Sequence, residues 1–146
     1  MNPHWDAAFT ALPNHPVTRG VRPFTLRDEW YFHLRFVDGR PGVKPLLVAR
    51  PDASTTTRPY GAHSGNPAMR AAGARGEPQT VAWSFTRPDG GRGFGLTGAH
   101  YHSNWGHESF RKLVLNAALW LAKMDVPAAG VASTVTAAAL AANLDP

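Results

Sequence analysis

The residue types best suited to chemistry lie in GLTGAHYHSNWGHESF, residues 95–110. His100, His102 and His107 stand close together there, between a glycine-rich apolar run and a long helical pattern. His100 and His102 are two positions apart at the end of an expected strand, so both point to one face if strand geometry persists. Two imidazoles and a carboxylate form a ligand set for zinc or another divalent ion, and Glu29 is the best candidate for the carboxylate.

The spacing of these histidines leaves a second interpretation open. No HExxH motif or other fixed metal-binding spacing is present. One histidine then packs in the interior, one caps the following helix and one is solvated. A site is still a reasonable expectation, because α/β folds place ligands where a strand end leads into a helix N-terminus.

Glu29 is also surrounded by candidates for a different chemistry. A carboxylate beside aromatic side chains is suited to proton transfer, so Glu29 and His102 are the candidate catalytic residues. The same carboxylate suits binding of a sugar hydroxyl, with aromatic rings as stacking surfaces. The alternative is a core strand whose acidic residues cap a loop. The candidate substrate-binding residues are Trp30, Tyr31, Tyr101, Trp105 and Asn104.

Other common chemistries are disfavoured by the residues present. The chain has no cysteine, which excludes disulfides, thiolate ligands and a cysteine nucleophile. No serine lies in a GxSxG elbow. The glycines of GFGLTG, residues 93–98, lie inside a strand pattern and not at its turn into a helix, so they do not predict a dinucleotide site.

The bulk properties are those of one globular domain. The chain has 146 residues and 43% of them are hydrophobic, which predicts a single packed core. The formal net charge is +5, but the arginines are scattered, so no nucleic-acid partner is expected. No signal peptide is visible, and the apolar stretch 113–122 is too short to span a bilayer. The default expectation is a cytoplasmic protein without a membrane partner, although a truncated N-terminus would hide a signal peptide.

In the first half of the chain, the patterns predict two strands and a long loop. A short helical turn is expected over Trp5–Leu12. Alternating β-forming residues predict a strand over Glu29–Phe36, turn residues fill 37–42, and a second strand covers 43–50. Residues 51–78 are rich in proline and glycine and poor in large apolar side chains, which predicts a long mobile loop.

In the second half, a hairpin and a helix are expected. Strands over 80–86 and 92–99 flank the turn sequence RPDGGR. A helix follows over 107–123 with Asn104 as its N-cap, and Thr136 caps a short helix over 137–143. The apolar stripe of the long helix is expected to comprise Phe110, Val114, Ala117 and Leu121, widened by Leu113 and Trp120.

Several of these stretches together carry a resemblance to a known family. They are HPVTRGVRPFTLRDEWYF (15–32), PLLVAR (45–50), VAWSF (81–85) and residues 90–123. With the elements HPVTRG, DEWY and GRGF…GH, they resemble the ThuA-like family of trehalose-utilisation proteins over about residues 1–132. The resemblance implies a flavodoxin-like α/β fold related to the class I glutamine amidotransferases, with a function linked to carbohydrates.

The same resemblance limits what the chain can do. His102 lies near the position of the relatives' catalytic histidine, but Asn104 stands where they carry a glutamate. With no cysteine anywhere, glutamine amidotransferase chemistry is excluded. The expected activity is binding or processing of a sugar or keto-sugar, such as a hydrolase reaction. The alternative is a non-catalytic interaction or structural module with a remnant cleft.

The resembling stretches correspond to the later part of the ThuA-like domain. We therefore expect one domain over residues 1–146, a truncated form with a partial sheet and one long packed helix. A sheet that lacks its first strands exposes an edge and an apolar face. A second copy of the same surface would cover both, so a homodimer is expected.

Overall fold

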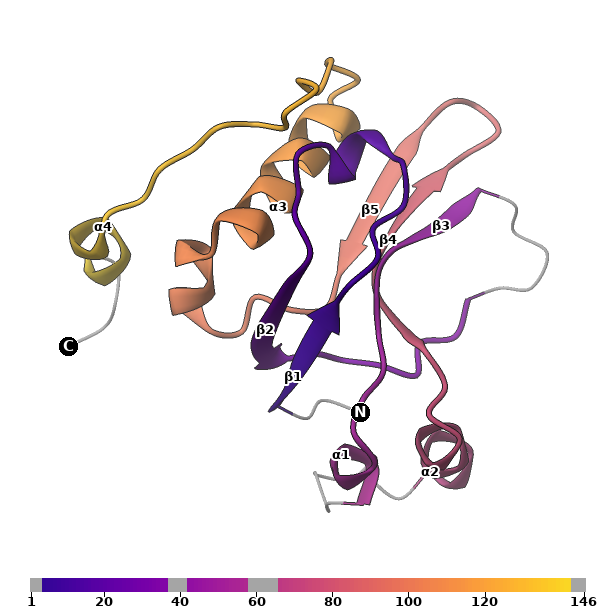
Figure 1. The fold of residues 1–146 in the computed structure, drawn as a ribbon. Helices are drawn as coiled ribbons and strands as arrows, with labels where there is room; N and C mark the ends of the chain where they lie inside the picture. The colour runs from indigo at the N-terminus through magenta and orange to yellow at the C-terminus, as the bar shows by residue number, and fades with distance from the viewer. Residues whose placement is uncertain (1–3, 37–41, 58–65, 143–146) are drawn as a thin grey trace.

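The computed structural model describes residues 4–36, 42–57 and 66–142 (Figure 1). The fold is mixed α/β, as expected, with two small sheets whose described pairings are all antiparallel. The first sheet pairs β1 (His4–Phe9) with β2 (Phe24–Glu29). The second has the order β3 (Val43–Ala49), β4 (Gln79–Thr86), β5 (Arg92–Leu96).

The N-terminal strands differ from the sequence-based expectation. Trp5, Ala7 and Phe9 are buried in alternation, so this stretch is a strand and not the helical turn expected over Trp5–Leu12. The strand expected over Glu29–Phe36 is also wrong, because β2 ends at Glu29. The chain turns away from β2 after Glu29, and the indole nitrogen of Trp30 donates to the Leu26 carbonyl oxygen at 2.9 Å.

The second sheet follows the sequence closely. The strands expected over 43–50 and 80–86 are confirmed, and β5 is three residues shorter than expected. The β4–β5 turn is held by Asp89, whose carboxylate accepts the Gly91 N–H at 2.8 Å. Pro45 lies in β3, an edge strand, where its missing N–H costs no ladder bond. The expected turn over 37–42 falls mostly on residues 37–41, outside the described residues.

Helix α3 (Glu108–Leu121) packs across the second sheet and against the 3-10 helix η1 (Pro16–Thr18). Its buried residues are displaced from the expected stripe: Leu121 is 40% exposed, and Leu113 and Trp120 take the central places. A buried amide also lies on this face. Asn116 is fully buried and donates to the carbonyl oxygens of Val17 and Arg19 at 3.0 and 2.9 Å.

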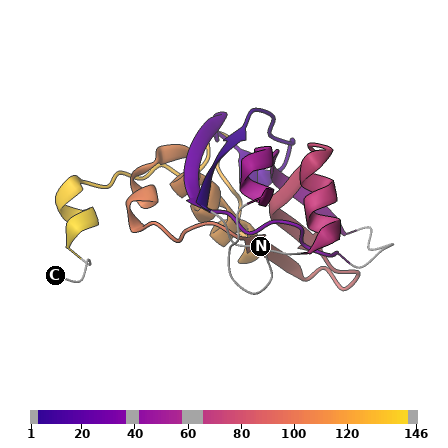
Figure 2. The ribbon, with the colours of Figure 1, turned by 90° about the horizontal axis from the view of Figure 1, so that it is seen from below.

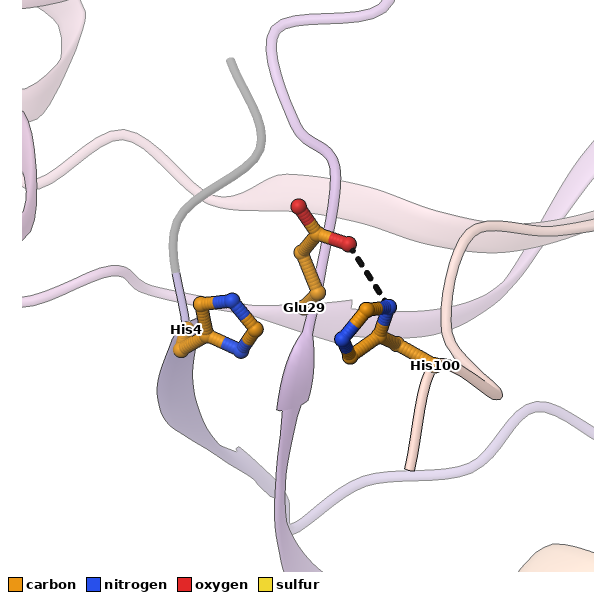
Figure 3. A group of neighbouring side chains, drawn as sticks. All are labelled: His4, Glu29 and His100. Carbon is orange, nitrogen blue, oxygen red and sulfur yellow. Dashed lines mark ion pairs between the residues drawn. The ribbon is translucent and has the colours of Figure 1, made fainter. Parts of the chain in front are cut away.

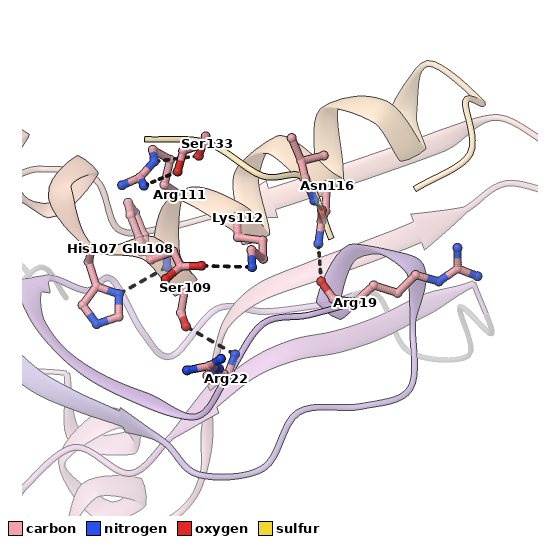
Figure 4. A network of polar contacts seen from close by, with 11 residues as sticks. Arg19, Arg22, His107, Glu108, Ser109, Arg111, Lys112, Asn116 and Ser133 are labelled. Atoms are coloured by element: carbon pink, nitrogen blue, oxygen red, sulfur yellow. Dashed lines mark hydrogen bonds and ion pairs between the residues drawn. The ribbon is translucent and has the colours of Figure 1, made fainter. Parts of the chain in front are cut away.

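Polar contacts of α3 also fasten the segment that follows it (Figure 4). Asn116 accepts the Val131 N–H at 2.8 Å. The Arg111 guanidinium donates to both the hydroxyl and the carbonyl oxygen of Ser133, at 2.8 and 2.9 Å, and to the Trp105 carbonyl at 2.7 Å. The chain thus runs back along α3 before it reaches α4 (Ala137–Ala141), which is capped by Thr136 as expected. Helix α4 lies at one end of the molecule in both views (Figures 1 and 2).

The segment 51–78 contains two helices where a loop was expected. They are α1 (Ala53–Thr57) and α2 (Pro67–Ala74), which contact one another (Figure 2). Asn66 accepts the Ala68 N–H at 3.0 Å, and a proline at the first helical position completes this start signal. Met69 and Ala72 are buried, which anchors α2. Residues 58–65 lie outside the described residues.

The C-terminus of α3 contains a strained residue. Lys123 has φ 59°, in the left-handed region that disfavours a side chain. The N–H groups of Lys123 and Met124 donate to the carbonyls of Trp120 and Leu119, at 3.1 and 3.0 Å. These two bonds form the Schellman arrangement, in which glycine is the preferred residue.

Replacing Lys123 with glycine should therefore stabilise the fold. Relief of the left-handed strain is worth about 1–2 kcal/mol, and the greater freedom of glycine in the unfolded chain offsets about 0.5–1 kcal/mol. Urea unfolding should show a net gain of about 0.5–1 kcal/mol. Lys123→Ala is the control, because it removes the charge but keeps the strained Cβ. An equal gain in both variants would refute the strain argument.

Candidate metal centre

Two histidines and a glutamate meet at the open end of the β1–β2 hairpin (Figure 3). One ligand atom from each of His4, Glu29 and His100 lies within 4.8 Å of the others. Nδ1 of His100 is 3.0 Å from Oε2 of Glu29. The Glu29 side chain is 11% exposed and that of His100 is 52% exposed. The carboxylate is therefore largely buried, while the His100 imidazole is accessible to solvent. Two imidazoles and one carboxylate match the three protein ligands of many catalytic zinc sites.

The strand register brings the first two of these residues together. His4 is paired with Glu29 in the antiparallel hairpin, and directly opposed side chains project from the same face of a sheet. The next pair on this face is Asp6 with Arg27, whose side chains are 3.0 Å apart. The opposite face carries Trp5 and its apolar neighbours into the core.

His100 is brought to Glu29 by a buried carboxylate. Asp28 is fully buried, and its Oδ1 accepts the backbone N–H groups of Glu29 and His100 at 2.7 and 2.9 Å. Its Oδ2 accepts the Ala99 N–H and the Asn104 amide at 2.8 and 2.9 Å. Ala99 is held at φ 81° by this arrangement. The same carboxylate therefore positions the backbones of two candidate ligands, which lie far apart in the chain.

Two tyrosines border the cluster. The Tyr101 hydroxyl is 2.7 Å from Nδ1 of His4, so a metal bound through Nε2 of His4 leaves an Nδ1–H that donates to the tyrosine oxygen. Such an outer partner fixes the tautomer and the orientation of a ligating imidazole. The Tyr31 hydroxyl donates to Oε2 of Glu29 at 3.4 Å. The negative charge of Glu29 raises the pKa of Tyr31, with smaller contributions from desolvation and from this hydrogen bond.

Of the residues expected to form a metal site, the structure brings together Glu29 and His100. His4 is a new member. Its sequence signal was the polar and apolar alternation at the start of HWDAAF, which is typical of a strand and not of the helical turn expected there. As a strand residue, His4 is two positions from Asp6 on the exposed face. Its pairing with Glu29 is not readable from the sequence, because register depends on the connection between the strands.

His102 and His107 lie outside this cluster. His102 begins the 3-10 helix η2 (His102–Gly106), and its Nε2 is buried without a hydrogen-bond partner among the described residues. Nδ1 of His107 accepts the Phe110 N–H at 3.4 Å and so caps α3, the role expected for Asn104. Strand β5 ends at Leu96 and Ala99 has φ 81°, so the strand alternation that would place His100 and His102 on one face is absent.

Three candidates for substrate binding have structural roles. Trp30 is fully buried in the core. The Asn104 amide is buried and donates to Asp28 and to the Arg27 carbonyl at 2.9 and 2.8 Å. Trp105 packs against the core with its ring 5.3 Å from that of Phe110. Tyr31, which is 43% exposed, and Tyr101 are the two that border the cluster.

Comparison of the chain with protein-family models, with curated proteins and with solved structures finds no match. The ThuA-like resemblance therefore stays a hypothesis. Within the described residues, no helix has the length and apolarity needed to cross a membrane.

Removing the Asp28 charge should destabilise the protein. In Asp28→Asn, an amide replaces one of two acceptor oxygens that together receive four N–H groups, so at least one buried donor loses its partner. The expected loss in the free energy of unfolding is about 1–3 kcal/mol, measured by urea denaturation. Asp125→Asn, at an exposed position, should change stability by less than about 0.5 kcal/mol. A loss in Asp28→Asn no larger than in this control would contradict the positioning role.

The capping histidine predicts how stability depends on pH. Desolvation, and secondarily Arg111, lower the pKa of His107 below its ordinary value of 6.5, against a smaller opposing effect of Glu108. The unfolded chain then binds more protons than the folded one as pH drops below 6.5. Stability from this group is present above that pH and is lost as pH falls through the folded pKa.

His107→Asn keeps a capping side chain and removes the titration. Chemical denaturation at pH 7 and at pH 5 should show a smaller acid-induced loss of stability in the variant. Some acid sensitivity should remain, because burial, Lys44 and Arg92 also lower the pKa of His15. An equal acid-induced loss of stability in the variant and in the natural chain would show that His107 does not contribute to the pH dependence.

Proposed function

We propose that the protein binds a divalent metal ion at His4, Glu29 and His100 and uses this site to bind or process a sugar or keto-sugar. The observation that carries the proposal is the approach of the three ligand atoms to within 4.8 Å of one another. Tetrahedral zinc ligands lie about 3.4 Å apart, so modest side-chain rotations bring these atoms to bonding distance.

The surroundings of the cluster support a functional metal site. Asp28 holds the backbones of Glu29 and His100, and Tyr101 holds the ring of His4. Three ligands from the protein leave a coordination position for another group, as in catalytic zinc sites. A divalent ion bound there would supply Lewis acidity to a substrate oxygen.

The carbohydrate assignment rests on the ThuA-like resemblance. The flavodoxin-like fold, the homodimer and the hydrolase class are proposals with the same origin. Residues from the resembling stretches 15–32 and 90–123 supply Glu29 and His100. Tyr31 and Tyr101 offer aromatic rings beside them for a sugar. This is the part of the proposal that depends on the resemblance and not on the geometry.

A second candidate function is a non-catalytic interaction module. It is favoured by the large apolar side chains that lie at least one-third exposed among the described residues, namely Tyr31, Leu34, Phe36, Leu121 and Met124. A module of this kind needs no metal, so metal binding separates the two candidates.

Metal binding is the direct test of the proposed function. Calorimetric titration of chain purified without a polyhistidine tag should show one zinc ion per chain. His4→Ala and Glu29→Gln should each weaken zinc binding at least tenfold, since removal even of an outer partner commonly costs about 10–100-fold. Zinc affinity should also fall in acid, because the imidazoles must be neutral to bind a metal ion.

His107→Asn is the matched control, since it removes a histidine from the neighbouring helix but leaves the cluster intact. It should bind zinc like the natural chain. Absence of zinc binding at neutral pH, or an equal loss in all three variants, would leave the interaction module as the better candidate.

A further inference from the structure

A small cavity adjoins the candidate metal centre and shares His4 with it. Its volume is about 210 Å³. Residues of the β1–β2 hairpin and residues at the start of α1 line it together. The hairpin contributes His4, Trp5, Asp6 and Arg27, and the α1 side contributes Asp52, Ser54 and Thr55.

The cavity is lined mainly by groups that form hydrogen bonds. Asp6 and Asp52 offer acceptor oxygens, Arg27 offers donors, and Ser54 and Thr55 carry hydroxyls that both donate and accept. A ligand rich in hydroxyl groups matches this mixture, because each hydroxyl also donates and accepts. An apolar ligand would displace water from these polar side chains and offer no hydrogen bonds in return.

The size of the cavity sets an upper limit on the ligand. Pockets for drug-sized ligands have volumes of about 300–1,000 Å³, and this cavity is smaller. It accommodates one sugar ring but not two. A second ring would have to lie in solvent, outside the lining residues.

The charged side chains that line the cavity are Asp6, Asp52 and Arg27, which together carry one net negative charge. Asp6 and Arg27 form an ion pair at 3.0 Å. Asp52 is a carboxylate whose pKa is lowered by hydrogen bonds from Ser54, so it is ionised at neutral pH. A phosphate group would therefore find no unpaired cation in the lining.

We propose that this cavity is the ligand pocket of the metal centre and that it takes an uncharged, hydroxyl-rich molecule the size of one sugar ring. The proposal rests on the proposed function, because the cavity matters for chemistry only if His4 belongs to a working centre. It adds the location of the ligand, its size and its charge.

The experiment compares glucose, maltose and glucose 6-phosphate as probes, by NMR titration of the full chain, with zinc binding measured separately. Ser54→Leu fills the cavity and should weaken glucose binding at least tenfold without changing zinc affinity. Thr134→Leu, at another exposed hydroxyl that does not line the cavity, should bind glucose normally. Asp52→Asn, which keeps a capping oxygen for α1, should narrow the preference for glucose over glucose 6-phosphate.

Each result decides the proposal. Glucose binding that survives in Ser54→Leu, or no glucose binding by a chain that binds zinc, would overturn the pocket but leave the metal centre standing. Glucose binding lost in Ser54→Leu by a chain that binds no zinc would show a sugar pocket without a metal centre, which overturns both the proposed function and the assignment of this cavity to a metal centre. Tighter binding of maltose, or of glucose 6-phosphate, would overturn the assigned size or charge.

Discussion

The buried carboxylate of Asp28 is the constraint on which this structure depends. Burying the Asp28 charge is costly unless it is satisfied by hydrogen bonds, and here four N–H groups supply them. Those donors come from β2, from the turn after β5 and from η2. The hydrogen bonds that the Asp28 carboxylate requires thus bring three segments together. Two of its donors are the backbone N–H groups of the candidate metal ligands Glu29 and His100.

The hairpin separates stability from chemistry by the alternation of its side chains. Trp5, Ala7 and Phe9 face the core, while His4 and Asp6 face outward and meet Glu29 and Arg27 from β2. A change on the outward face leaves the apolar packing untouched. Two polar side chains of helix α3 hold neighbouring segments in place. Asn116 donates to the Val17 carbonyl before the helix, and Arg111 donates to the Ser133 carbonyl after it.

Local signals in the sequence predicted a good part of the fold. The hairpin β4–β5, strand β3, helix α3 and the Thr136 cap follow from turn residues, periodicity and capping preferences that act over a few positions. The role of His107 was open, since one of the three histidines was expected to cap the helix. The partnership of His4 with Glu29, and of Asp28 with the His100 backbone, was out of reach because each depends on contacts between distant segments. Helices α1 and α2 were missed because a short helix anchored by Met69 and Ala72 carries little apolar periodicity.

The separation between Asp28 and its partners has a consequence for synthesis of the protein. The backbone donors at Ala99 and His100 follow Asp28 by 71 and 72 residues, and a ribosome adds that length in about 4–14 s. During this interval Asp28 stays in water, and the β1–β2 hairpin lacks the later core residues Phe110 and Leu113. Two strands alone are at best marginally stable. Trp5 and Phe9 are then exposed on the nascent chain. The N-terminal third is consequently the natural target for a chaperone until the last third emerges.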